Sequence, residues 1–154
     1  MSDWKRRTKE VSFEILSTEM ADAIQRHIER YNLGPILADA LMCVQTDSEK
    51  TKKGIFGKTE TVKMAAIVTP RWLVWAIEQP NAPATALSAQ LSHVTVQDYA
   101  QTQFAKLVPD YGIEVSGMLT DASESASAFI GLEESDAGNR FKAIVISAAQ
   151  QAKK

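Results

Sequence analysis

The chain has 154 residues, 45% of them hydrophobic, and a formal charge of only -2 at neutral pH. A chain of this length can bury a core without disulfides, and its composition excludes a disordered or coiled-coil protein. The small net charge excludes a protein that binds polyanions over its whole surface. The single cysteine cannot form an intramolecular disulfide, and no apolar run approaches the ~20 residues of a membrane span, so we expect a cytoplasmic protein.

The first third of the sequence predicts an amphipathic helix. Apolar residues recur there at three- and four-residue steps, the spacing of one helical face. They are Phe13, Leu16, Met20, Ile24, Ile28 and Tyr31. Gly34 and Pro35 then mark the end of the helix. We therefore expect residues 1–36 to form an N-terminal helical extension before a domain at residues 37–154.

Beyond residue 37 the apolar period changes to two, which is typical of strands. The segments predicted as strands are residues 41–53, 61–69, 72–77, 86–91, 94–99, 112–119 and 126–132. A last helical stripe at residues 141–148 predicts a C-terminal helix with Ser135 or Asp136 as its N-cap. This order predicts a mainly β (α+β) fold, a partly open antiparallel barrel or sandwich of about seven strands closed by the C-terminal helix.

Two sequence phrases carry a family resemblance. They are Lys-Lys-Gly-Ile-Phe-Gly at residues 52–57 and Val-Lys-Met-Ala-Ala-Ile-Val-Thr-Pro-Arg-Trp-Leu-Val-Trp-Ala at residues 62–76. Together with the order of elements from Leu37 to Ala152, they make the chain resemble the bacterial pleckstrin-homology (PH)-like domains. The resemblance implies that residues 62–76 form the second and third strands of such a domain. It also implies a capping helix starting near Phe141, and assembly into oligomers, as in many bacterial relatives.

Charge is segregated along the sequence. Residues 50–71 contain six basic side chains and one acidic one, whereas residues 72–139 contain nine acidic side chains and one basic one. In lipid-binding relatives, phosphates bind to basic residues of the first hairpin. The matching candidates here are Lys50, Lys52, Lys53, Lys58 and Lys63, with Ile55 and Phe56 as an apolar tip. The alternative interpretation is a solvated hairpin whose lysines protect a sheet edge. The acidic remainder argues against nucleic acid as a partner.

Sequence motifs for catalysis are missing. There is no Gly-x-Ser-x-Gly, and Gly-Ile-Phe-Gly-Lys-Thr at residues 54–59 lacks the earlier glycine of a phosphate-binding loop, since residue 52 is lysine. Two histidines and one cysteine are too few and too scattered to predict zinc. We therefore expect no enzyme activity, no catalytic residues, no metal and no cofactor.

The two tryptophans of residues 72–77 predict more apolar surface than one small barrel needs. Trp72 and Trp75 point to opposite faces of a strand, so only one of them can lie in the barrel core. The candidates for a protein interface are Trp72, Met20, Ile24 and Ile28, unless the first helix folds back as a cover. The leading hypothesis is a binding or scaffold module for a protein partner or for self-assembly into a homo-oligomer. The alternative is weak peripheral binding of anionic lipid or another phosphate ligand.

Overall fold

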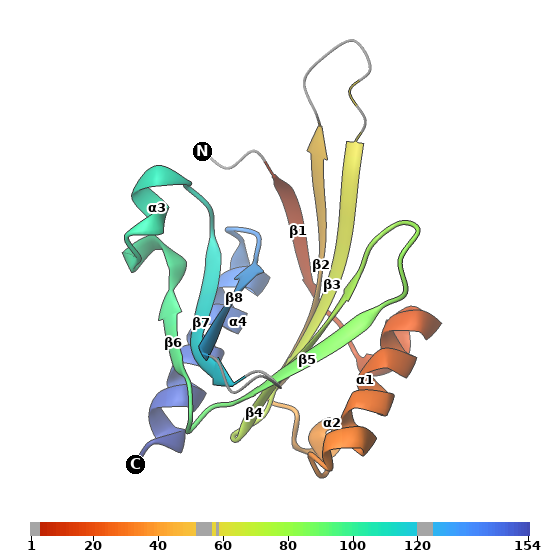
Figure 1. Cartoon of the computed structure of the whole chain (residues 1–154), viewed down its shortest axis with the longest axis vertical. Coiled ribbons are helices and arrows are strands. Elements are labelled where there is room, and N and C mark those ends of the chain that lie inside the picture. Colours follow the sequence, from red (N-terminus) through yellow and green to blue (C-terminus); the bar gives the residue numbers. More distant parts are fainter. Residues whose placement is uncertain (1–3, 52–56, 58, 120–124) are drawn as a thin grey trace.

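The computed structural model describes residues 4–51, 57, 59–119 and 125–154, and within them the chain forms two antiparallel sheets (Figure 1). The first sheet has the order β1-β2-β3-β4-β5, with β1 at Lys5–Glu10, β2 at Met42–Thr51, β3 at Thr59–Val68, β4 at Trp72–Glu78 and β5 at Thr85–Gln90. The second has the order β6-β7-β8, with β6 at Thr95–Asp98, β7 at Gly112–Leu119 and β8 at Ser125–Gly131. The predicted mainly β architecture is confirmed, and across the described ranges the sheets stay open.

Two long helices flank the sheets, α1 at Thr18–Tyr31 and α4 at Asp136–Ala152. The short elements are η1 at Phe13–Ile15, α2 at Ile36–Asp39, η2 at Tyr99–Gln101 and α3 at Phe104–Leu107. Helix α1 begins later than its apolar stripe predicts because Ser17 caps it, its Oγ accepting a hydrogen bond from the Met20 N–H at 3.2 Å. It ends at Asn32, whose φ of 52° is left-handed. Of the two predicted caps of α4, the structure uses Ser135, whose Oγ accepts a hydrogen bond from the Gly138 N–H.

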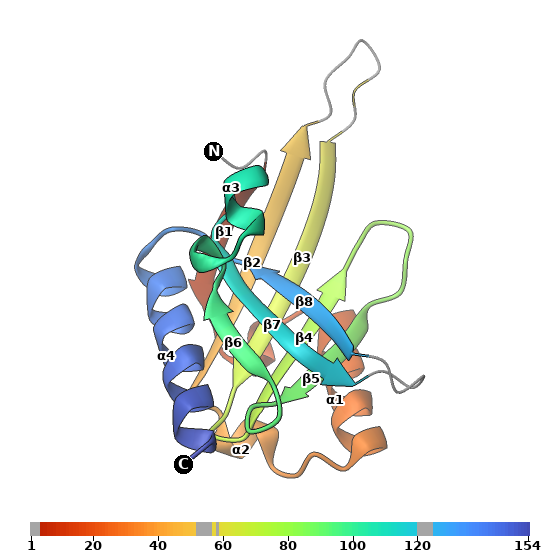
Figure 2. The same ribbon diagram turned by 60° about the vertical axis from the view of Figure 1, so that its left-hand side comes forward.

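The main core lies between the two sheets and α4. Its fully buried side chains include Trp75 from β4, Ile113 from β7, Ile130 from β8 and Phe141 from α4. Helix α4 lies beside β6, on the side of the molecule away from α1, as both ribbon views show (Figure 2). The predicted closing helix is thus present, and its apolar stripe completes the core.

A second apolar cluster lies on the outer face of the first sheet, under α1. Met20 and Ile24 of α1 are fully buried there against Ile67 of β3 and Val74 of β4. The middle of the sheet is therefore covered on both faces, by α4 and the second sheet on one side and by α1 on the other (Figure 1). The first helix is the cover of its own sheet.

Residues 5–10 form a strand that the sequence pattern did not predict. Strand β1 pairs with β2 along its whole length, from Lys5 opposite Glu49 to Glu10 opposite Val44. Its sequence, Lys-Arg-Arg-Thr-Lys-Glu, has no apolar face from which strand alternation could be recognised. The residues before position 36 therefore contribute a sheet strand as well as a helix.

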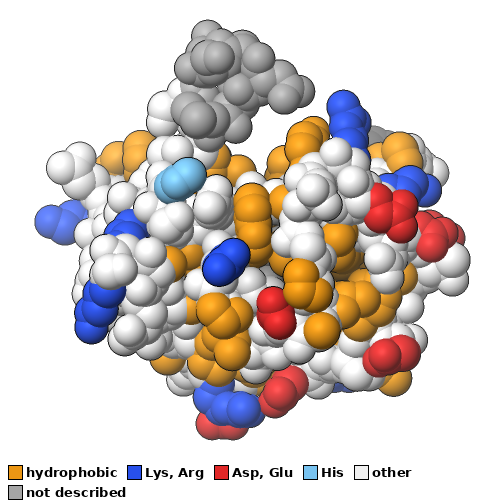
Figure 3. All heavy atoms as spheres, turned by 90° about the horizontal axis from the view of Figure 1, so that it is seen from below, with side chains coloured by type: hydrophobic (Ala, Val, Ile, Leu, Met, Phe, Trp, Pro, Cys, Tyr) orange, Lys and Arg blue, Asp and Glu red, His pale blue; other side chains and the backbone are white. Residues whose placement is uncertain are grey.

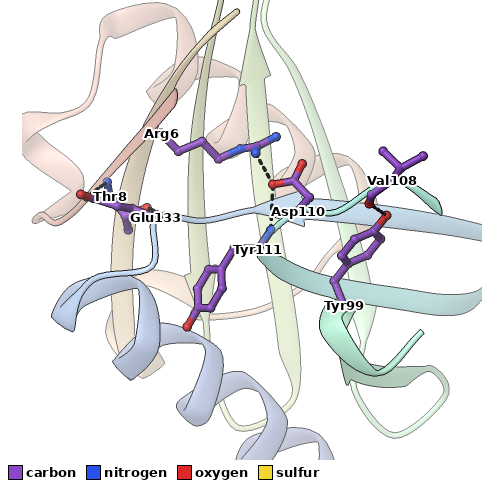
Figure 4. Close-up of polar contacts among 7 residues, drawn as sticks. All are labelled: Arg6, Thr8, Tyr99, Val108, Asp110, Tyr111 and Glu133. Atoms are coloured by element: carbon purple, nitrogen blue, oxygen red, sulfur yellow. Dashed lines mark hydrogen bonds and ion pairs between the residues drawn. The ribbon is translucent and has the colours of Figure 1, made fainter. Parts of the chain in front are cut away.

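Polar contacts join β1 to the second sheet and to the start of α4 (Figure 4). The Arg6 guanidinium and the Asp110 carboxylate are 2.5 Å apart, both with only 11% of the side chain exposed. The Thr8 N–H donates to Glu133 Oε1 at 2.9 Å, and the Thr8 hydroxyl accepts from the Glu133 N–H at 2.8 Å. These reciprocal bonds hold the first strand against the segment that leads into α4.

Candidate functional site

Three adjoining hollows of about 600, 450 and 410 Å³ follow the outer edge of β5, and together they form what we name the β5 groove. Its walls come from α1 (Arg26, His27, Arg30, Tyr31), from β4 and β5 (Trp72, Leu87, Ser88) and from β7 and β8 (Met118, Ala126, Ala128). Figure 3 views the end of the molecule where β4 begins and β5 ends. Hydrophobic side chains gather in the middle of that face, and charged ones lie mostly around its margin.

The backbone of β5 is unpaired on the side that faces the groove. In the ladder, β5 pairs only with β4 among the described strands. The Leu91 N–H donates to the Arg71 carbonyl at 2.8 Å. Because the direction of the backbone groups alternates along a strand, the N–H and C=O groups of every second residue before Leu91 also point toward β4. The N–H and C=O groups of Ala86 and Ser88 therefore point away from β4. No backbone hydrogen bond from the described part of the chain reaches them.

Apolar side chains lie on both sides of this free edge. Leu87 keeps 41% of its surface exposed and Tyr31 keeps 49%, while Trp72 and Met118 are half-buried. Large side chains that are exposed beside an unpaired strand edge are typical of an interaction site. The groove thus offers backbone hydrogen bonds and apolar contacts in one place.

His27 links α1 to β5 at the centre of the groove. Its Nε2 lies 2.8 Å from Ser88 Oγ, and its ring centroid lies 4.7 Å from that of Tyr31. Burial lowers the pKa of His27 below the usual 6.5, and the positive charge of Arg30 lowers it further. The neutral form of His27 therefore predominates at pH 7.

We expect acid to weaken this link between α1 and β5. Because the folded protein holds the pKa of His27 below 6.5, protonation favours the unfolded state. The free energy of unfolding should fall as the pH drops below about 6.5, and this contribution should level off below the folded-state pKa. His27→Gln should lose less stability than the wild type between about pH 7 and pH 5 in urea unfolding. Equal losses in both proteins would show that His27 does not contribute.

The structure separates the four candidates for a protein interface. Trp72 lines the β5 groove and is half-buried, and Ile28 is half-buried at the margin of the outer cluster. Met20 and Ile24 have no exposed surface, because the sheet of the same chain covers them. They act as core residues in this structure, which is the outcome expected if the first helix folds back as a cover of its own sheet.

The described lysines of the first hairpin do not converge on one site. Lys50 lies on the inner face of β2, with its Nζ 5.7 Å from the Trp4 ring centroid. Lys63 is exposed on the opposite face of the sheet, opposite Asp47 and Glu78 in the strand register. The remaining candidates lie outside the described residues: Lys52, Lys53, Ile55, Phe56 and Lys58.

The one cysteine and the potential metal ligands of the described ranges do not form a reactive or metal-binding group. Cys43 is buried under α1, and burial, helped by the charge of Glu14, raises the pKa of its thiol to about 11. A thiol with such a pKa remains protonated at neutral pH and is a poor nucleophile. Among residues 4–51, 57, 59–119 and 125–154, no three His, Cys, Asp or Glu side chains are grouped closely enough to hold a metal ion.

Sequence reasoning did not identify the residues that make the groove, apart from Trp72. The apolar alternation at residues 86–91 predicted a strand, but nothing local to it shows that one edge stays unpaired. In the sequence, Arg26 and Arg30 lie on the polar side of the predicted first helix, a pattern typical of an ordinary solvated surface. A usable signal was Leu87, a large apolar residue between small ones, Ala86 and Ser88, in a strand with little apolar surface of its own.

Within the described residues, no helix combines the length and the apolar character needed to cross a bilayer. Comparison of the chain with protein-family models, with curated proteins and with solved structures returned no match. The fold and the β5 groove therefore have to be interpreted from their own geometry.

Proposed function

We propose that this chain is a non-enzymatic binding module with a PH-like fold, and that it binds an extended segment of a protein partner along β5. The observation that carries the proposal is the unpaired edge of β5 between apolar walls. Strand addition to such an edge is a common mode of peptide recognition. Main-chain hydrogen bonds give affinity in that mode, and pockets for alternate side chains give specificity.

The topology supports the PH-like part of the proposal. After residue 37, a four-stranded antiparallel run, β2 to β5, is followed by the three strands β6 to β8 and by α4. These are the seven strands and the closing helix that the sequence resemblance implies. Residues 62–76 fall in the second and third of these strands, β3 and β4, as in the related domains.

The dimensions of the groove support an extended ligand. Ala86 and Ser88 together present two N–H donors and two C=O acceptors, enough for one ladder with a short strand. Side chains of an added strand alternate between the two faces of the sheet. On one face they meet Leu87 and Met118, and on the other they meet Trp72 and Tyr31.

Anionic lipid remains the second candidate, with less support. The described lysines of the candidate lipid site, Lys50 and Lys63, lie on opposite faces of the hairpin. The residues paired with them on neighbouring strands are all acidic: Glu60, Asp47 and Glu78. Cross-strand pairing of opposite charges stabilises a sheet and reduces the net field that a phosphate would meet. We therefore favour the β5 groove.

Substitution of Ser88 tests strand addition directly. Ser88→Pro removes an N–H that points away from β4, so it should spare the ladder of the sheet itself. Ser88→Ala is the matched control, since it also loses the hydrogen bond to His27 but keeps the N–H. We expect peptides selected from a random display library on the wild-type protein to bind Ser88→Pro at least about tenfold more weakly, a loss of ~1.4 kcal/mol. Ser88→Ala should stay within about twofold of the wild type.

Fluorescence polarisation with the selected peptides measures these affinities, and far-UV circular dichroism checks that both variants fold. Failure to select any peptide, or equal binding by Ser88→Pro and Ser88→Ala, would rule out strand addition at β5.

A further inference from the structure

The charged side chains that line the described part of the β5 groove are all of one sign. Among the described residues that line it, the charged side chains are Arg26 and Arg30, both exposed on α1. The acidic residues of the same helix, such as Asp22 and Glu29, are exposed but do not line the groove. The described walls are thus cationic and apolar.

The two guanidinium groups are available for a ligand. Neither Arg26 nor Arg30 forms an ion pair or a side-chain hydrogen bond with another described residue, and Arg30 lies 5.4 Å from the Tyr31 ring centroid. They are four residues apart on α1, so they project from the same helix face. The hollow that they line, of about 450 Å³, is completed by residues 84–87 at the start of β5.

A strand bound to β5 would pass directly in front of these arginines. Because Ala86 offers the first outward backbone groups of β5 and lines the same hollow, a residue paired near it has its side chain within the cationic part of the groove. Arginine binds carboxylates through two parallel hydrogen bonds, which gives orientation as well as affinity. A basic side chain in that position would meet two like charges.

We propose that the partner segment is acidic, with carboxylates that bind Arg26 and Arg30 and apolar side chains that fill the space around Leu87 and Trp72. This inference rests on the proposed function, since it assigns the chemistry of the segment that β5 binds. Charge complementarity of this kind governs partner choice and association rate, and it weakens as salt screens exposed charges.

Two peptide display libraries with the same apolar positions test the inference on the intact protein. In one library the remaining positions are Asp or Glu, and in the other they are Lys or Arg. We expect the wild type to enrich the acidic library at least about tenfold over the basic one at low ionic strength. Arg26→Gln combined with Arg30→Gln should abolish this preference. The matched control is Arg7→Gln combined with Lys9→Gln, which removes the same charge from exposed positions of β1, at the opposite edge of the sheet, and should leave the preference unchanged.

The outcomes separate the inference from the proposed function. Equal enrichment of both libraries, lost in Ser88→Pro, would overturn the acidic partner and leave strand addition at β5 standing. Enrichment of neither library would overturn both. A dimer in sedimentation velocity that Ser88→Pro dissociates and Ser88→Ala does not would identify a second copy of the chain as the occupant, and would also overturn the acidic segment.

Discussion

Trp75→Ala should lower the free energy of unfolding by about 3–5 kcal/mol. Trp75 is the largest fully buried side chain, 1% exposed, and it lies in the core between the sheets. Its removal leaves a cavity that the two sheets and α4 cannot fill without distorting the ladder of β4. Since domains of this size are stable by only about 5–15 kcal/mol, the variant should be marginally folded.

Trp72→Ala is the matched control, because it removes the same side chain from the other face of the same strand. Trp72 is half-buried at the β5 groove, so the loss of stability should be less than half as large. Urea unfolding followed by far-UV circular dichroism measures both variants without depending on tryptophan fluorescence. Similar losses in the two variants would contradict the placement of Trp75 in the core and of Trp72 at its margin.

The second large effect is expected at the ion pair between Arg6 and Asp110. Asp110→Ala leaves the guanidinium buried between the rings of Trp4 and Phe129, whose centroids lie 5.5 and 5.6 Å from it. Burial already lowers the pKa of Arg6, and Asp110 opposes that effect. Leaving such a charge without its partner costs on the order of 3 kcal/mol. The loss should appear in urea unfolding as a lower midpoint.

The double variant Arg6→Met with Asp110→Leu separates the charge from the contact. Replacing both partners with apolar side chains of similar volume removes the uncompensated charge, so it should recover most of the lost stability. If the double variant is as unstable as Asp110→Ala, the contact itself and not the buried charge stabilises β1.

Gly131 leaves room for the Arg6 side chain, because a Cβ added at Gly131 would lie 2.2 Å from the Arg6 Nε.

Local patterns were sufficient for the elements that have their own apolar face. The helical stripe of α1 is visible within a short window because side-chain direction follows the helical period, and the aromatic and branched apolar residues of β4 favour a strand by their type. The N-cap of α4 could also be predicted locally to within one residue, as Ser135 or Asp136, and Ser135 is the cap. Strand β1 was missed for the same reason, since its two faces are both polar and its only signal is its pairing with β2.

Local sequence patterns could not predict that Lys50 and Lys63 lie on opposite faces of the sheet. Both lie in a lysine-rich stretch of sequence that predicts one basic patch. The register of β2 with β3 instead places Lys50 on the inner face of the sheet and Lys63 on the outer face. Because side chains alternate with period two, only the register decides which charges share a face. The candidate anion site required these lysines to share one face, so it depended on the register of β2 with β3.

The sequence by itself determined the order of the two long helices and of the strands after residue 37, the closing helix, the segregation of charge and the lack of catalytic motifs. Only the tertiary structure decided that α1 covers its own sheet, that Met20 and Ile24 are core residues, and that β5 has a free edge beside Arg26 and Arg30. The physical reason is the separation along the sequence of the residues that interact. Helix and strand periods are set by neighbours a few residues apart, whereas an unpaired edge is defined by which distant strands pair with one another and which do not.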